Sequence, residues 1–229
     1  MSDLKPNPFY KLYDKAIKTS ERPYNGRGIL LKRCPQCQLS KPYCICNNIK
    51  TIQSNIEFAL IFHRDEVFKP TNSGRLIGEV FPEQSHFFIW DRTAPPEQLL
   101  KMINDPNRDC YLLFPADSKE LHNCAERLQT TAKDRLITLI VLDGTWRQAR
   151  RMFNRSEWLQ GLKVLTLNPQ KVAEYSTREA AHEHYLSTAE SVVLALEISQ
   201  YESERSALQQ VFTLFNKHYY LMKNNILPS

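Results

Sequence analysis

An aspartate that follows a strand-like apolar run has the residue type and the position to do chemistry. Residues 137–142 are almost wholly apolar and rich in β-branched side chains, which is typical of a parallel strand covered on both faces, and Asp143 follows directly. Gly144 then allows a sharp turn, and Thr145 with Gln148 has the spacing of a capping box that begins a helix. Parallel sheets bind ligands at the carboxyl ends of their strands, where helix N-termini offer free N–H groups. The pattern therefore predicts a ligand site around Asp143.

The predicted helix after Asp143 separates into an apolar face and a cationic face. Trp146, Ala149 and Phe153 recur at helical spacing and are expected to pack inwards. Four arginines form the adjacent stripe, namely Arg147, Arg150, Arg151 and Arg155. Like charges at this spacing repel one another, and a bound polyanion would relieve that repulsion. We therefore expect the stripe to contact a polyanion rather than solvent alone.

Four cysteines near the N-terminus have the spacing of a metal site. They follow the pattern C-x2-C-x6-C-x-C and are Cys34, Cys37, Cys44 and Cys46. Four thiolates within such a short segment fit one tetrahedral Zn²⁺ and resemble a compact zinc knuckle. Because four protein ligands leave no open coordination position, the predicted zinc is structural rather than catalytic.

The composition is that of an ordinary globular chain, but the charge is unevenly distributed. Of the 229 residues 42% are hydrophobic and 24% are charged, and no apolar run reaches membrane-spanning length, so no membrane association is expected. The polar first 20 residues contain no secretory signal, which favours the cytoplasm. Residues 1–50 hold ten Lys and Arg against three Asp and Glu, a net charge of +7, whereas the whole chain has +5. This asymmetry points to a nucleic acid or another phosphate-rich partner, and a solvated basic tail is the alternative.

Apolar runs and turn signals together predict an α/β fold. Strands are expected at residues 56–62, 86–90, 110–114, 137–142 and 163–167. Helices are expected between and after them, at residues 76–81, 96–102, 119–130, from residue 145 onwards, at 187–199 and at 204–222. The alternation predicts a mainly parallel sheet flanked by helices. Residues 170–186 are expected to be irregular, and the chain is expected to divide into a basic N-terminal segment with the knuckle (1–50) and a larger domain (51–229).

The loop after the first predicted strand is dense in polar side chains. Lys69, Asn72 and Arg75 lie in it, close in sequence to His63 at the strand end. Asn72 or Thr71 could simply cap the following helix. If the strand is parallel to residues 137–142, however, this loop lies at the same edge of the sheet as Asp143. No G-x-G-x-x-G or P-loop pattern occurs, so a classical dinucleotide or P-loop site is disfavoured.

These motifs occur together in one known family. The chain resembles the DTW-domain family, and within it the bacterial tRNA-uridine aminocarboxypropyltransferases, over about residues 30–200. The resemblance lies in the four-cysteine knuckle and in the stretches 71–76 (Thr-Asn-Ser-Gly-Arg-Leu), 114–115 (Phe-Pro), 143–146 (Asp-Gly-Thr-Trp) and 186–190 (Leu-Ser-Thr-Ala-Glu).

The resemblance implies an S-adenosylmethionine enzyme of the SPOUT-related class, whose parallel sheet is tied in a trefoil knot near its C-terminal half. Such family members transfer the 3-amino-3-carboxypropyl group of S-adenosylmethionine to N3 of a uridine in the tRNA variable loop and release methylthioadenosine. The expected partner is therefore tRNA. No obligate protein partner is expected, and a monomer is favoured.

The resemblance also implies roles at the strand end. Asp143 is expected to accept the N3 proton or to orient the uridine, and the alternative is that it only satisfies backbone N–H groups at the turn. Thr145 is expected to hold the turn rather than to do chemistry. Trp146 could stack on a flipped base or on the donor's methionyl chain, or it could simply be the first core residue of its helix.

The remaining implied site residues divide into a donor set and a tRNA set. Loops after the last strands are expected to hold the donor through Phe114, Pro115, Ala116, Leu165, Leu167, Asn168, Pro169, Leu186, Ser187 and Thr188. Arg178 is the candidate partner for the donor's carboxylate, because a guanidinium fork suits a bidentate ligand, and a solvated loop arginine is the alternative. The tRNA is expected to contact the N-terminal segment and Lys69, Asn72, Arg75, Arg147, Arg150, Arg151 and Arg155.

Two other functions fit the same sequence. One is an RNA methyltransferase of the same knotted class, which would share the donor and the pocket and differ only in the carbon that is attacked. The other is a non-catalytic RNA-binding protein built on the zinc knuckle and the basic helix. The spacing of residues does not separate these functions.

Overall fold

A parallel β-sheet forms the centre of the computed structural model, which describes residues 7–20, 30–115, 123–178 and 186–228. Within these residues six strands pair in the order β2-β1-β5-β3-β6-β4, and every pairing is parallel. The strands are β1 (Ile56–Phe62), β2 (Ser85–Ile89), β3 (Arg108–Pro115), β4 (Cys124–Ala125), β5 (Leu136–Asp143) and β6 (Lys163–Leu167). The predicted mainly parallel α/β sheet is thus confirmed.

The strand that carries Asp143 lies in the middle of this sheet. β5 pairs with β1 on one side and with β3 on the other, and the register places Asp143 opposite Phe62. All residues of β5 after Leu136 are buried, which explains why its sequence is a continuous apolar run rather than an alternating one. The loops after β1 and β5 therefore begin side by side at one edge of the sheet.

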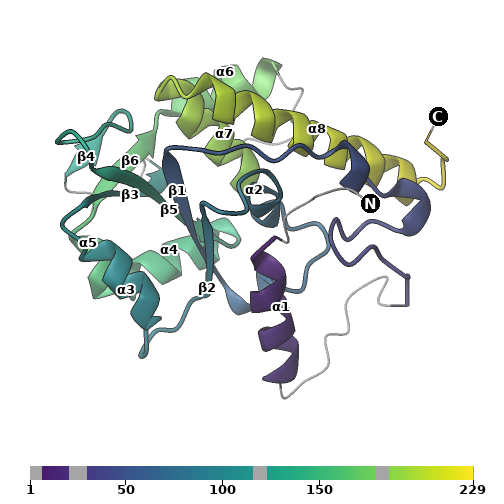
Figure 1. Ribbon diagram of the computed structural model, residues 1–229, viewed down its shortest axis with the longest axis horizontal. Helices are drawn as coiled ribbons and strands as arrows, with labels where there is room; N and C mark the ends of the chain where they lie inside the picture. The colour runs from purple at the N-terminus through teal and green to yellow at the C-terminus, as the bar shows by residue number, and fades with distance from the viewer. Residues whose placement is uncertain (1–6, 21–29, 116–122, 179–185, 229) are drawn as a thin grey trace.

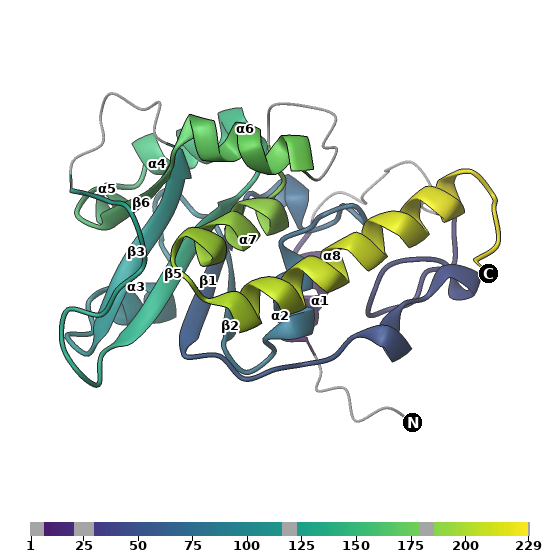
Figure 2. The same ribbon diagram turned by 90° about the horizontal axis from the view of Figure 1, so that it is seen from above.

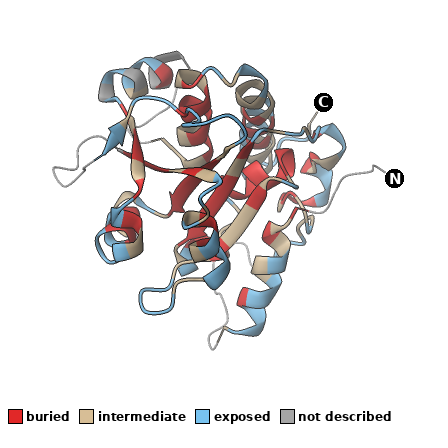
Figure 3. Cartoon of the chain, turned by 60° about the vertical axis from the view of Figure 1, so that its left-hand side comes forward, coloured by how far each residue is buried: buried red, intermediate tan, exposed pale blue. Residues whose placement is uncertain are grey.

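Side chains that alternate along the strands build two separate cores, one on each face of the sheet. On β1, Phe58, Leu60 and Phe62 belong to one core, whereas Ala59 and Ile61 belong to the other. The first core is covered by α1 (Phe9–Lys18), α2 (Arg75–Val80), α7 (Thr188–Ile198) and α8 (Glu202–Lys223). The second core is covered by α3 (Glu97–Ile103), α4 (Trp146–Asn154) and α5 (Glu157–Gln160), so the sheet is a buried middle layer (Figures 1, 2 and 3).

The N-terminal cysteine segment packs against the far end of the C-terminal helix (Figure 1). It contains the short 3-10 helices η1 (Lys41–Tyr43) and η2 (Cys46–Asn48), and a third, η3 (Arg64–Glu66), follows β1. The backbone N–H of Ser40 donates to Met222 Sδ at 3.4 Å, and the His218 ring lies 3.0 Å from the carbonyl oxygen of Tyr43. Ile45 is fully buried in the same core as β1. The knuckle and the sheet domain are therefore packed together.

Two sequence predictions about helices were wrong. Residues 124–125 form strand β4 beside β6, and residues 126–130 are not helical, although a helix was expected over 119–130; residues 116–122 lie outside the described part of the chain. Here the backbone N–H of Leu128 donates to Ser199 Oγ at 2.9 Å, so a tertiary contact replaces a helical hydrogen bond. Conversely, α6 (Pro169–Arg178) forms where irregular chain was expected, because Asn168 accepts the N–H of Gln170 at 2.8 Å and begins a helix there.

None of the described helices combines the length and the apolar character that crossing a membrane requires.

Candidate active site at the carboxyl end of β5

Three segments that are far apart in the sequence meet at Asp143. Asn72, in the turn before α2, donates from Nδ2 to Asp143 Oδ1 at 2.5 Å. The neighbouring Ser73 Oγ accepts the backbone N–H of Ala189, in the first turn of α7, at 3.2 Å. The stretches 71–76, 143–146 and 186–190, which carried the family resemblance, thus converge at one edge of the sheet.

The carboxyl group of Asp143 is removed from water. The residue is only 1% exposed, and burial raises its pKa from an ordinary 3.8 to about 7. The hydrogen bond from Asn72 and the nearby Thr188 side chain lower the pKa, the negative charge of Glu66 raises it, and the positive charge of Lys69 lowers it. A carboxyl group with this pKa exchanges its proton near neutral pH, as a general base requires.

The second carboxyl oxygen of Asp143 has no hydrogen-bond partner within the described residues. It points at the backbone of Gly74, where an added Cβ atom would lie 2.1 Å from Oδ2. Only glycine therefore allows the turn to approach the carboxylate this closely. A buried, unpartnered acceptor costs free energy in the folded protein, and such groups gather at sites that bind ligands.

The start of α4 has the predicted capping box. Thr145 Oγ1 accepts the backbone N–H of Gln148, and Gln148 Oε1 accepts the backbone N–H of Thr145 at 2.7 Å. The Gln148 amide also contacts His63 Nδ1 at 3.0 Å, and the backbone N–H of His63 donates to the carbonyl of Asp143 at 2.8 Å. Thr145 accordingly holds the turn, as expected, while Gln148 connects that turn to the end of β1.

Trp146 is half-buried between an expected donor residue and an expected tRNA residue. Its ring stacks on Phe114 with 6.1 Å between ring centroids, and the Arg150 guanidinium lies 5.5 Å above it. The other arginines of the stripe, Arg147, Arg151 and Arg155, are exposed, and they form no ion pair with any residue that the structure describes. α4 therefore presents a cationic surface that starts beside Asp143.

The expected donor residues on strands lie close together, and the side chains of Phe114, Leu165 and Leu167 are buried. Pro115 at the end of β3 is in register with Leu167 at the end of β6, and Leu165 and Phe114 are buried within the sheet. Ala116 lies outside the described residues. These residues therefore lie at adjacent strand ends, where S-adenosylmethionine would contact their backbone groups rather than their apolar side chains.

The remaining donor residues lie at helix ends. Asn168 is exposed and accepts a hydrogen bond at the start of α6, of which Pro169 is the first residue and Arg178 the last. At the start of α7, Ser187 forms a second capping box with Glu190, and Leu186 and Thr188 flank Ser187. Of this group, Thr188 lies near enough to Asp143 to affect its pKa.

Three residues in the loop after β1 were expected to contact tRNA, and their side chains are buried or paired within the protein. Arg75 is 1% exposed and donates to backbone carbonyls, and Asn72 is buried against Asp143, so neither presents its side chain to a surface ligand. Lys69 is half-exposed and pairs with Glu66 at 2.6 Å. Parallel pairing of β1 with β5 brings Asn72 over Asp143, and contacts with the knuckle and with Phe215 bury Arg75.

Three residues that sequence reasoning did not assign to the site belong to its immediate surroundings. They are His63, Glu66 and Gly74, and each acts on Asp143 through a contact or a charge described above. The sequence signal of His63 and Glu66 is a position shortly after a predicted strand, whereas Gly74 also lies in the stretch 71–76 that carried the family resemblance. The pairing of β1 with β5 places these three residues around Asp143, and the local sequence pattern does not predict which strands pair.

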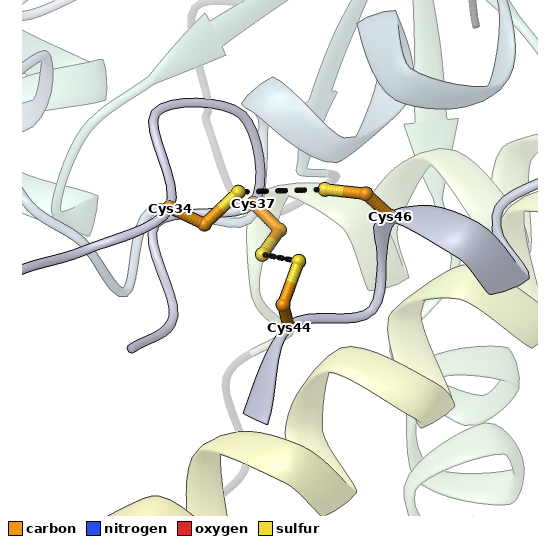
Figure 4. Close-up of side chains that lie close together, drawn as sticks. All are labelled: Cys34, Cys37, Cys44 and Cys46. Atoms are coloured by element: carbon orange, nitrogen blue, oxygen red, sulfur yellow. Dashed lines mark hydrogen bonds between the residues drawn. The ribbon is translucent and has the colours of Figure 1, made fainter. Parts of the chain in front are cut away.

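The four knuckle cysteines gather into one cluster (Figure 4). All four Sγ atoms lie within 4.8 Å of one another, with Cys34 to Cys46 at 3.6 Å and Cys37 to Cys44 at 3.7 Å. Four thiolates around one Zn²⁺ at a Zn–S distance of about 2.3 Å have sulfurs about 3.8 Å apart. Burial raises the pKa of Cys44 to about 11, so full ionisation of the cluster needs a cation. The donor set therefore fits a structural zinc.

The family comparison agrees with this arrangement. The sequence matches the family model of the DTW domain over residues 31–220, which includes the knuckle, the sheet and most of α8. The chain belongs to the DTW domain family. Membership of the DTW family is consistent with a tRNA-modifying enzyme. No solved structure gives a significant match to the chain.

Proposed function

We propose that this DTW-domain protein transfers the 3-amino-3-carboxypropyl group of S-adenosylmethionine to N3 of a uridine in the tRNA variable loop. The observation that carries the proposal is the buried carboxyl group of Asp143, with a pKa of about 7 and one unpartnered oxygen, where the three family motifs meet. A non-catalytic RNA-binding surface has no need of such a costly group.

Asp143 supplies the proton transfer that this reaction needs. Its carboxylate accepts the imide proton of the uridine on Oδ2, while the Asn72 amide holds Oδ1 in place. The nitrogen forms a bond to the donor carbon next to the sulfonium, the carbon–sulfur bond breaks, and its electron pair stays on the sulfur of methylthioadenosine. Because Gly74 covers Oδ2, a uridine reaches this oxygen only when the turn 71–75 moves.

The surroundings of Asp143 divide into a donor side and a tRNA side. On the donor side lie the ends of β3 and β6 and the start of α7, whose backbone groups and Thr188 face the same edge of the sheet. On the tRNA side lies the exposed arginine stripe of α4, which suits phosphate contacts that position an RNA without reading its sequence. Trp146 lies between the two sides, where its ring could stack on a base.

The proposal extends to features around the site. We include a SPOUT-related fold with a trefoil knot, on the strength of the family resemblance, and a division into a knuckle segment (1–50) and a catalytic domain (51–229). We also include a cytoplasmic monomer that binds tRNA, the donor S-adenosylmethionine and one structural zinc. The thiol cluster supports the zinc.

One assay tests the reaction directly. The zinc-loaded protein is incubated with S-adenosylmethionine and tRNA that lacks the modification, and mass spectrometry identifies the modified nucleoside and the sulfur product. The proposal expects an aminocarboxypropyl-uridine and methylthioadenosine in equal amounts. Asp143→Asn should lower kcat at least 100-fold and leave tRNA affinity within about threefold, since only proton transfer is lost.

Other products of this assay would contradict the proposal in recognisable ways. S-adenosylhomocysteine with a methylated nucleoside would make the protein a methyltransferase. Tight tRNA binding without any sulfur product, together with unchanged binding by Asp143→Asn, would make it an RNA-binding protein.

A further inference from the structure

Among the described residues Arg75 is the largest fully buried side chain, and its guanidinium donates to backbone carbonyls and interacts with the charge of the buried Glu79. Its Nη2 donates to the carbonyl oxygen of Cys37 at 2.7 Å and to that of Pro70 at 3.2 Å, and its Nη1 reaches the carbonyl of Gln36 at 3.4 Å. The guanidinium also lies 5.0 Å above the ring of Phe215 in α8. One side chain thus joins the knuckle, the turn before α2 and the C-terminal helix.

The backbone of Arg75 faces the opposite way, towards the site. Its N–H donates to Asn72 Oδ1 at 3.1 Å. Because Asn72 Oδ1 is occupied in this way, the amide must turn its Nδ2 towards Asp143, to which it donates at 2.5 Å. A continuous series of hydrogen bonds therefore runs from the carbonyl of Cys37, through Arg75 and Asn72, to Asp143.

The knuckle end of this series depends on the geometry of a metal ligand. Gln36 lies between the first two cysteines and Cys37 is the second of them, so a metal on the four thiols would fix the direction of both carbonyls. A second contact strengthens the junction, since Gln36 Nε2 donates to the buried Glu79 in α2 at 2.9 Å. Displacement of the knuckle turn would therefore disturb contacts at both ends of α2.

We propose that Arg75 is a positioning residue that couples the four-cysteine knuckle to Asp143: its guanidinium fixes the knuckle carbonyls, and its backbone fixes Asn72. Metal in the knuckle then anchors the Arg75 end of the turn, so that Asn72 keeps its hydrogen bond to Asp143 Oδ1 when the residues over Oδ2 move to admit a uridine. Lysine is a poor substitute, because a single ammonium group cannot match the planar fork that meets several carbonyls at once. This inference rests on the proposed function only for its effect on catalysis.

Hydrogen exchange measured by mass spectrometry tests the coupling without any assay of activity. In the zinc-loaded protein, Arg75→Met should speed hydrogen exchange of the amides in residues 70–80 about tenfold or more. The exchange rates of Arg75→Lys should lie between those of the natural protein and those of Arg75→Met. Arg108→Met is the matched control, because Arg108 is also largely buried and bonds Glu57, Thr138 and Asp105, but at the opposite end of the sheet. It should leave exchange in residues 70–80 unchanged.

Removal of the metal completes a double-mutant cycle. Chelation should speed exchange in residues 70–80 of the natural protein, whereas it should add less than twofold in Arg75→Met, where the connection is already lost. Equal effects of chelation in both proteins would overturn the proposal. Equal exchange in Arg75→Met and Arg108→Met would do so too, because it would make Arg75 an ordinary structural residue.

Steady-state kinetics separates this inference from the proposed function. Arg75→Met should lower kcat about tenfold to a hundredfold with little change in KM for tRNA, and Arg75→Lys should restore part of the loss. If the natural protein transfers no group from S-adenosylmethionine, the proposed function fails, and the exchange cycle still decides whether Arg75 couples the two sites. If transfer occurs and Arg75→Met keeps full kcat, positioning by Arg75 is refuted.

Discussion

At the scale of single residues, the site depends on a carboxyl group that the fold holds at a cost in stability. Asp143 is buried, carries one hydrogen bond from Asn72 and leaves its second oxygen without a partner in the described residues. The neighbouring Glu66 makes its ionisation still harder. Such an arrangement is poor for stability and good for proton transfer near neutral pH, which is the usual compromise at a catalytic position.

Replacement of Asp143 by asparagine should therefore stabilise the protein, and more so at high pH. Its pKa is about 7 in the folded protein against 3.8 normally, so the folded state binds the proton more tightly than the unfolded chain does. The stability of the natural protein consequently falls as pH rises from about 4 to about 7, by on the order of 4 kcal/mol in all. Urea unfolding should show a gain from Asp143→Asn that is about 2 to 3 kcal/mol larger at pH 8 than at pH 5. A gain independent of pH would contradict the raised pKa.

Gly74 offers a steric test of the same carboxyl group. In Gly74→Ala the added Cβ would lie 2.1 Å from Asp143 Oδ2, so the turn must move away and the Asn72 hydrogen bond must weaken. We expect a loss of about 2 kcal/mol in stability and a fall in kcat of more than tenfold. Gly161→Ala is the control, because nothing lies within 4 Å of its added Cβ. Similar behaviour of the two variants would argue against close packing at Asp143.

At the scale of secondary structure, α4 joins the interior of the protein to its cationic surface. Its inner face contributes Ala149, Met152 and Phe153 to the core, and the capping box at Thr145 fixes its start at Trp146. The outer face carries the arginines, and Arg150 lies over the ring of Trp146. A helix that begins at the site and extends along the surface can align an RNA with the carboxyl group.

Neutralising two arginines of α4 should weaken tRNA binding selectively. Arg147→Gln with Arg151→Gln removes two exposed positive charges, so the slope of log K against log salt should shrink by about 2. Donor binding, measured separately by calorimetry, should stay within about twofold. Lys101→Gln with Lys133→Gln makes the same change in charge near the amino ends of the strands and should leave tRNA affinity almost unchanged. Selective loss of donor affinity would contradict the division into a donor side and a tRNA side.

At the scale of the whole molecule, the knuckle packs closely against the sheet domain. Ile45 and Tyr43 belong to the same core as β1 and α8, and the first helix contributes Phe9 to that core. The N-terminal segment also reaches α2, where Asn7 Nδ2 donates to the carbonyl of Arg75 at 3.0 Å. Metal binding in the knuckle is therefore expected to stabilise the entire domain.

Metal analysis should find one zinc per chain in the natural protein. Cys34→Ser should lose the metal and lower the unfolding temperature, because three thiolates bind zinc more weakly and the knuckle loses its cross-link. Cys124→Ser is the matched control, since Cys124 is an exposed cysteine outside the cluster. This variant should keep the metal and the unfolding temperature of the natural protein. Zinc affinity should fall as pH falls, because the thiols must lose their protons to bind. Full zinc content in Cys34→Ser would contradict the four-cysteine site.

Much of the architecture could be predicted from the sequence because the relevant signals are local. The apolar run that ends at Asp143, the capping boxes at Thr145 and Ser187 and the spacing of the cysteines each act within a few residues. These signals predicted the five main strands and the helices α4, α7 and α8. The exception at residues 124–130 was decided by a strand partner and by a contact from Ser199. The helix at residues 169–178 begins instead at a local cap, Asn168, which the sequence analysis did not use.

By itself, then, the sequence determined the parallel strands, the helix starts and the identity of the residues that could do chemistry. Only the tertiary structure decided which of them meet. Pairing of β1 with β5 brings Asn72 and Gly74 onto Asp143, whereas the knuckle and α8 bury Arg75, which was expected to contact tRNA. The physical reason is that hydrogen-bonded pairing and burial act between residues about seventy positions apart, whereas sequence periodicity reports only on neighbours within a turn or a strand.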